Sequence, residues 1–382
     1  MAKQSQVRPR RTWRYLLWLL GGLIGTILLV PLIFIGLQCG PFRTVIPEPA
    51  RDPALVVAWQ HADAHLRPED QTYLTFPEWY IVFSADEYAH HVQTELPSSF
   101  PFLASVRQYW EGYAAVCRTT AGTYEFNGGY HLMLYVIGVS FTVENGLKGI
   151  YEGTVGRLTE ALSGTEVSPG LPTAEDALAR QYAKEYGDFI HAIPWFDFPY
   201  LEKLQQLWTT TGWWGPNPLR KWERKVALSV EFLGKAAYGA LIGWGTETTY
   251  GAVDMEIYAL ATGITDDVLT DFSEVHLVER IDDGLALITI PHYQPFTDLV
   301  PQLTEAGVHF IEFAGNDHVM LSAFAPHDWS GALTGTEIMF QMPVLVDPAH
   351  QRLGLNIPVA NLHNVLAEMA AQDMVVEHIY DY

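Results

Sequence analysis

The sequence predicts an N-terminal transmembrane helix, a mainly α-helical domain and a C-terminal α+β domain of the ferredoxin-like kind. Three observations support this fold class. Residues 15–42 contain no charged side chain. Residues 55–255 carry apolar side chains at helical spacing, and beyond about residue 265 short apolar or alternating runs are separated by turn residues. We therefore divide the chain into a basic tail (1–14), a transmembrane helix (15–38), a linker (39–54), a helical domain (55–260) and an α+β domain (266–382).

The uncharged segment is long enough to be a membrane anchor. A hydrocarbon core about 30 Å thick requires roughly 20 apolar residues in a helix. A cleaved signal peptide would have a shorter apolar region that ends in a small-residue cleavage site. Pro31 lies inside the run and is compatible with a membrane helix. The segment is therefore predicted to be an uncleaved anchor.

The distribution of charge predicts the orientation of this anchor. Six of the 22 Lys and Arg residues, and none of the 44 Asp and Glu residues, lie in the first 43 positions. Five of these cations precede the apolar run, so the positive-inside rule places the N-terminus in the cytoplasm. We expect a single-pass protein of a bacterial inner membrane with its main body in the periplasm. The acidic body repels phosphate backbones, which argues against nucleic acid as a partner.

A second segment, residues 126–143, is also free of charge and reaches the lower limit of spanning length. Asn127 and His131 interrupt it, and a short apolar run is more often a buried core helix. The sequence leaves both readings open.

The chain has two cysteines, Cys39 and Cys117. They match neither a disulfide framework nor a metal-binding spacing. Cys117 lies in a helical stretch, and we predict that it is a small buried side chain.

Apolar periodicity and capping signals predict six helices in the central part of the chain. Ser84 and Glu87 have the spacing of a capping box, and Thr173 is followed by acidic residues, as expected for an N-cap. The predicted helices cover Leu55–Leu66, Ser84–Leu96, Pro101–Thr120, Tyr130–Leu162 and Thr173–His191, and the last begins at Asn217-Pro218.

The C-terminal part shows three hairpin signals, two helices and a final strand. The hairpins are Glu274–Ile281 with Leu285–His292, Val308–Ala314 with His318–Ala325, and Glu337–Val346 with Arg352–Ile357. The helices are Pro295–Ala306 and Val359–Gln372, and the strand is Met374–Tyr380. This order is that of a ferredoxin-like sandwich with an extra hairpin. Because that fold has many unrelated functions, it predicts no activity.

Histidines and carboxylates three or four residues apart are the first candidate site. This spacing places two ligands on one helix face, and di-iron bundles combine two Glu-x-x-His pairs with two lone glutamates. Glu111 and Glu144 lie on intervening helices and suit the lone positions. Such pairs also arise by chance in a helical chain with 14 histidines, and the sequence identifies no cofactor. The metal-ligand candidates are His61, His65, Glu87, His90, His91, Asp188 and His191.

A Trp-rich and basic segment is the second candidate site. Indole rings favour the headgroup region, and clustered cations are attracted to anionic lipid. The alternative is a Trp-rich core between helices. The membrane-interface candidates are Trp195, Trp213, Trp214, Arg220, Lys221, Arg224 and Lys225.

Glu78 is a weak candidate for a catalytic residue. It lies beside Phe76 and Trp79 and is expected to be a buried acid with a raised pKa, as in general acid catalysis. Such a glutamate more often caps a helix or pairs with an arginine.

These observations favour a membrane-associated binding or assembly module, with the bilayer and an unidentified protein as partners. The alternative is a membrane-bound metal-dependent enzyme that uses the His and carboxylate pairs. The sequence does not decide whether the protein is an enzyme.

Overall fold

The computed structural model describes residues 10–45, 52–60, 62–163, 173–191, 193–246, 256–281 and 284–381. Helix α1 (Arg10–Gln38) contains the segment Leu17–Gln38, which is long and apolar enough to cross a membrane. Within the described residues it is the only helix that meets this test, so residues 126–143 do not qualify as a second span.

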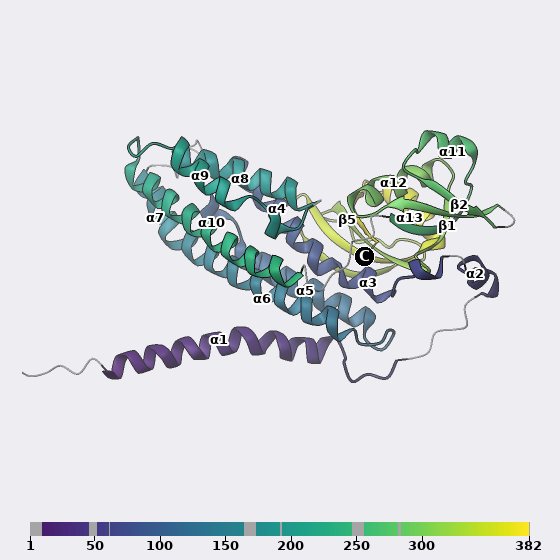
Figure 1. Cartoon of the computed structure of the whole chain (residues 1–382), viewed down its shortest axis with the longest axis horizontal. Helices are drawn as coiled ribbons and strands as arrows, with labels where there is room; N and C mark the ends of the chain where they lie inside the picture. Colours follow the sequence, from purple (N-terminus) through teal and green to yellow (C-terminus); the bar gives the residue numbers. More distant parts are fainter. Residues whose placement is uncertain are drawn as a thin grey trace, which may run out of the picture.

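A bundle of long helices follows α1 and leads to the sheets (Figure 1). Its long members are α4 (Phe76–Thr94), α5 (Phe102–Thr120), α6 (Gly128–Tyr151), α8 (Ala174–Ile190), α9 (Tyr200–Thr210) and α10 (Pro218–Thr246). A π-helical turn (Glu152–Gly156) joins α6 to α7 (Arg157–Ser163). The short helical segments are α2 (Pro53–Ala58), η1 (Asp63–His65), α3 (Asp70–Leu74), η2 (Pro97–Ser99) and η5 (Trp195–Asp197).

Most of the predicted helices are present, but one predicted start is wrong. Thr173 caps α8 as expected, because its hydroxyl accepts the backbone N–H of Asp176. Ser84 caps nothing. Helix α4 begins at Phe76 with Pro77 in its first turn, where the fixed φ of proline suits a helix start. The Ser84 hydroxyl lies inside the bundle, 2.7 Å from that of Ser105.

The C-terminal part contains two four-stranded antiparallel sheets rather than the single sheet that the sequence predicted. The first has the order β2-β3-β1-β4 and the second β6-β7-β5-β8. The strands are β1 (Glu256–Thr262), β2 (His276–Arg280), β3 (Leu285–Pro291), β4 (His309–Phe313), β5 (His318–Pro326), β6 (Glu337–Pro343), β7 (His350–Pro358) and β8 (Val375–Tyr380). The accompanying helices are α11 (Asp266–Asp271), α12 (Gln294–Glu305), η6 (Val359–Asn361) and α13 (Leu362–Ala371).

Two of the three predicted hairpins are confirmed, because β2 pairs with β3 and β6 pairs with β7. The hairpin predicted around residues 315–317 is wrong. Strand β4 pairs with β1, which sequence periodicity did not reveal, whereas β5 pairs with β7 and β8. The chain therefore passes from one sheet to the other at this turn.

The described residues form four clusters of buried apolar side chains, and the two largest involve the sheets. One lies between the two sheets, α12 and α13, and includes Ile288, Phe296 and Leu355. The other joins the bundle to the second sheet, where Phe76 of α4 packs near Tyr380 of β8. The bundle and the second sheet therefore share buried apolar side chains.

Candidate functional site

A disulfide attaches the N-terminal helix to the bundle. Cys39, directly after α1, bonds to Cys117 on α5, with 4.4 Å between their Cα atoms. Cys117 is buried, as predicted, but as half of a disulfide rather than as a free thiol. The apolar helix and the disulfide together indicate a secreted or membrane-anchored protein.

The second half of α1 also packs against α5 and α6. The ring of Phe34 lies edge-on to that of Trp110, with 5.1 Å between centroids. The hydroxyl of Tyr135 on α6 donates a hydrogen bond to the carbonyl oxygen of Leu28, at 3.1 Å. Figure 1 shows α1 and α6 meeting near the end of α1 and diverging toward its start.

Helices α6, α7 and α10 each expose a row of large apolar side chains, and we call these rows together the apolar face. Its large members are Leu132, Val136, Val143, Leu147, Ile150, Val155, Leu158 and Leu162 on α6 to α7, and Leu219, Val226, Val230, Leu233 and Leu241 on α10. Among residues 128–163 the exposed charged side chains are those of Arg157 and, at 42%, Glu144, and among residues 218–242 none is exposed.

The four cations predicted to meet lipid are buried instead. Asp176 pairs with Arg220 (Nη2 to Oδ1, 2.8 Å), and Glu175 with Lys221 (Nζ to Oε1, 2.6 Å). Glu152 pairs with Arg224, and Lys225 donates to the carbonyl of Thr211. This part of the interface prediction is wrong, because each cation is surrounded by the bundle and bonded to partners inside it.

The tryptophans of the predicted membrane interface, unlike its cations, are partly or largely exposed. Trp213 and Trp214 lie at the turn before α10, with 61% and 86% of their surface exposed. Trp195 is half-buried and stacks on Tyr238. The indoles of Trp213 and Trp214 therefore stay available as interface residues.

Polar pairs link α6 and α7 to α10 along their length, and we call this series the polar ladder. Its members are Ser140 with Tyr238 (2.7 Å), Glu144 with Lys235 (3.0 Å), Lys148 with Glu231 (2.8 Å), Glu152 with Arg224 (2.8 Å) and Glu160 with Arg220 (3.4 Å). The ladder lies behind the apolar face. These helices thus place charge inside and apolar groups outside, the reverse of an ordinary water-soluble helix.

The predicted metal ligands are not brought together within the described residues. Glu87 bonds to Arg352 at 3.0 Å, whereas His191 bonds to Asp86 and Asp188 to Lys184, each at 2.7 Å. The remaining candidates are also separate. His90 is exposed, the Nε2 of His91 lies 3.2 Å from the Leu96 carbonyl oxygen, and His65 stacks on Tyr258. His61 lies outside the described residues. Of the lone acids, Glu111 pairs with Arg107 and Glu144 belongs to the polar ladder.

Two other groups of potential ligands lie within reach of a common ion among the described residues. In one, Cys39 and Cys117 are already bonded to each other beside His131. The other consists of Glu69, Asp317 and His318 near the surface, where Asp317 Oδ1 lies 2.6 Å from His318 Nδ1. Neither group contains a ligand that the sequence predicted.

Glu78 and two histidines lie where the bundle meets the second sheet. Glu78 accepts a hydrogen bond from the hydroxyl of Tyr130, and burial raises its pKa to about 7. His378 of β8 is fully buried with its ring 3.7 Å from that of Trp79, and burial lowers its pKa to about 3. The Trp79 ring also lies near that of His191, with 6.2 Å between centroids, so Trp79 contacts both histidines.

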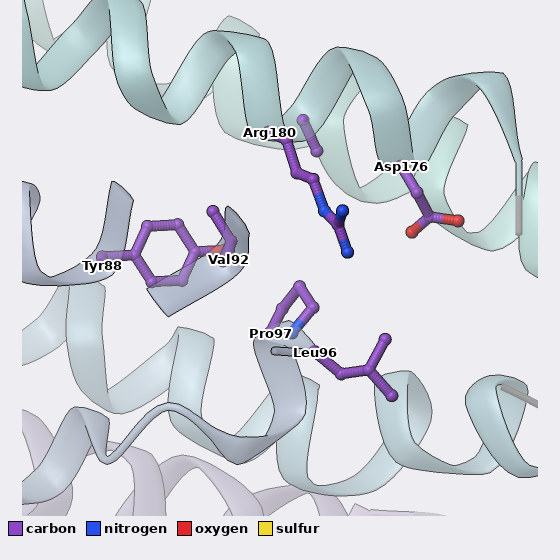
Figure 2. A pocket seen from close by; sticks show the side chains of 7 residues that line it. Tyr88, Val92, Leu96, Pro97, Asp176 and Arg180 are labelled. Carbon is purple, nitrogen blue, oxygen red and sulfur yellow. The ribbon is translucent and has the colours of Figure 1, made fainter. Parts of the chain in front are cut away.

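A small hollow lies between α4, η2 and α8 (Figure 2). The side chain of Arg180 points into it, beside Asp176 and opposite Pro97. Its volume of about 20 Å³ is room for little more than one water molecule. It is therefore too small for an organic ligand.

Comparisons of the chain with protein-family models, with curated proteins and with solved structures give no match.

Proposed function

We propose that the protein is a membrane-anchored binding or assembly module whose bundle is immersed in the bilayer through its apolar face. The observation that carries this proposal is the reversed arrangement of α6, α7 and α10. Charged side chains in lipid-embedded helices face the bundle interior and pair with one another. Full burial of a large apolar side chain is worth about 1.5–3 kcal/mol. The thirteen side chains of this face are 37–67% exposed, so in water each forgoes part of that free energy, which favours a lipid environment.

The contacts of α1 support a common depth for α1 and α6. Leu28 lies ten residues before Gln38, the end of the span, which is about 15 Å along a helix. That is half the thickness of a typical hydrocarbon core. Tyr135 bonds to Leu28, so the start of α6 enters the bilayer together with the second half of α1.

The opposite side of the bundle suits water or a protein partner. Helix α8 lies away from α1 (Figure 1) and exposes Gln181, Lys184 and Asp188.

The N-terminus lies in the cytoplasm and the sheets in the periplasm, since the basic tail precedes the span. Each sheet is a ferredoxin-like unit, because its first and third strands are central, although the second unit has no α-helix between β5 and β6.

Labelling by a lipid-soluble carbene precursor tests the apolar face. The full chain is placed in phospholipid nanodiscs, irradiated, digested and mapped by mass spectrometry. We expect peptides of α6, α7 and α10 to be labelled at least five-fold more than those of α8, with α1 as the positive control. Labelling of α6 and α10 no greater than that of α8 would overturn the proposal.

A further inference from the structure

A polar cavity lies behind the apolar face, among α4, α5, α6, α8 and α10. Its volume is about 60 Å³, room for a few water molecules. Its lining includes four charged side chains, those of Glu144, Lys148, Glu231 and Lys235. It coincides with the second and third pairs of the polar ladder, Glu144 with Lys235 and Lys148 with Glu231.

The four charges in this cavity alternate in sign. Lys148 lies 3.0 Å from Glu144 and 2.8 Å from Glu231. Lys235 lies 3.0 Å from Glu144 and 3.8 Å from Glu231. Two cations and two anions cancel, so neither a lone anion nor a lone cation is favoured. A ligand that carries one charge of each sign matches the arrangement, because each of its groups meets an opposite charge.

The cavity opens beside the apolar face. Among its charged side chains Glu144 is the most exposed, at 42%, followed by Lys148 at 26%. Val143 and Leu147 alternate with these two residues along α6, and both belong to the apolar face. A ligand that enters here therefore passes between lipid-facing side chains, and the apolar rings of Phe102 and Phe141 form part of the wall.

We propose that the mouth of this cavity, where Glu144 and Lys148 are partly exposed, binds the headgroup of a zwitterionic phospholipid of the ethanolamine class. The phosphate pairs with Lys148, and the primary ammonium donates hydrogen bonds to Glu144 and Glu231. A choline headgroup cannot donate those hydrogen bonds, because its nitrogen carries three methyl groups and no N–H. The inference rests on the proposed function, since the lipid must reach the mouth from the bilayer.

The first test uses the wild-type full chain in detergent and native mass spectrometry. Phosphatidylethanolamine, phosphatidylcholine and phosphatidylglycerol with identical acyl chains are titrated separately. We expect phosphatidylethanolamine to bind at least five-fold more tightly than either of the others. Equal binding of all three, or preference for the choline or glycerol headgroup, would overturn the inference.

The second test locates the site with a charge-neutral pair of substitutions. The double variant Lys148→Met/Glu231→Gln removes one cation and one acid, which avoids leaving an unpaired buried charge. The control Lys184→Met/Asp188→Asn removes the exposed pair on α8, which has the same chemistry. We expect at least a ten-fold loss of phosphatidylethanolamine affinity in the first variant and less than a two-fold change in the control.

The single variant Glu144→Gln guards against misfolding of the double variant. Glu144 is the most exposed of the four charges, so this change is expected to disturb the bundle least, and to weaken binding about three-fold or more. Unchanged binding in both site variants would overturn the inference. Carbene labelling of the apolar face separates the two proposals: if the face is labelled but headgroup preference is absent, only this inference fails.

Discussion

Arg352 of β7 bonds to Glu87 of α4 across the contact between the second sheet and the bundle, with 3.0 Å between Nη2 and Oε1. The same guanidinium bonds to Glu377 of β8 at 2.7 Å. All three side chains are at least nine-tenths buried, and the Arg352 guanidinium lies over the ring of Phe83. One buried cation thus joins two parts of the chain that are 265 residues apart in sequence.

Replacing this cation should be costly. Arg352→Met leaves two carboxylates buried without their cation, and losing one member of a buried ion pair typically costs about 3–5 kcal/mol. We expect the free energy of unfolding in urea, measured in detergent, to fall by that amount. Arg107→Met, which removes an exposed pair with Glu111, is the control and should cost less than about 1 kcal/mol. Similar losses in the two variants would contradict a structural role for the Arg352 pairs.

Reduction of the disulfide should destabilise the chain. The bond closes a loop of 78 residues, and the chain-entropy model gives about 4.5 kcal/mol for that length, before any native-state strain is subtracted. We expect Cys39→Ser/Cys117→Ser to lower the free energy of unfolding by about 2–4 kcal/mol, and dithiothreitol to have a similar effect on the wild type but none on the variant. If dithiothreitol destabilises both proteins equally, the effect does not come from this bond.

A charge on the apolar face should be tolerated less well than the same charge on α8. Leu147 has 64% of its surface exposed, so in water Leu147→Arg would cost little. In a bilayer an arginine at depth costs about 2.5–3.5 kcal/mol on insertion scales. We expect Leu147→Arg to lower the melting temperature in nanodiscs by several degrees more than Gln181→Arg. Equal melting temperatures would place Leu147 outside the lipid.

Acid should weaken the contact between the bundle and the second sheet through His378. Burial lowers the pKa of this histidine from 6.5 to about 3. In this pH range the unfolded state therefore binds a proton at His378 that the folded state does not bind, so the free energy of unfolding falls as the pH drops from 6.5 toward 3. Between pH 6.5 and 5 the contribution is about 2 kcal/mol. His378→Gln should reduce the loss of stability over this interval by that amount, as measured by urea unfolding.

Glu78 should make the protein less stable as the pH rises, the opposite of the effect of His378. Burial raises its pKa from 4.5 to about 7, so the folded state holds a proton that the unfolded state has released. Its contribution to stability therefore falls as the pH rises from 4.5 to 7. Glu78→Gln keeps a hydrogen-bonding partner for Tyr130 and should flatten the pH dependence on that side. An unchanged profile would mean that Glu78 does not titrate in this range.

Capping residues and prolines in the sequence correctly predicted where two of the long helices begin. Thr173 with acids after it starts α8, and Asn217-Pro218 starts α10, because capping and the fixed φ of proline act within one turn. Strand β1 was missed because Ile257 to Ala261 form a nearly continuous buried run without clear alternation. A strand covered on both sides lacks the period-two pattern that identifies an ordinary strand.

The candidate site depends on contacts that a linear pattern does not contain. Arg220 and Arg224 look like a surface patch in the sequence, and their partners Asp176 and Glu152 lie 44 and 72 residues earlier. The same holds for Cys117, whose partner precedes it by 78 residues. Helical spacing correctly indicated that Glu87 lies on a helix, but no sequence pattern indicated that its carboxylate would form an ion pair with Arg352.

The bond between Cys39 and Cys117 makes the chain a reporter of its own topology. Thiols stay reduced in the cytoplasm of most cells and are oxidised after export. Cys39 directly follows the span and Cys117 belongs to the folded body, so the bond can form only if both reach the same oxidising side. Alkylation of intact cells followed by mass analysis would therefore read out the sidedness of the body without any fusion tag. If the body lies on the exported side, the protein is expected to be two hydrogen atoms lighter than its reduced form and to carry no alkyl group on either cysteine.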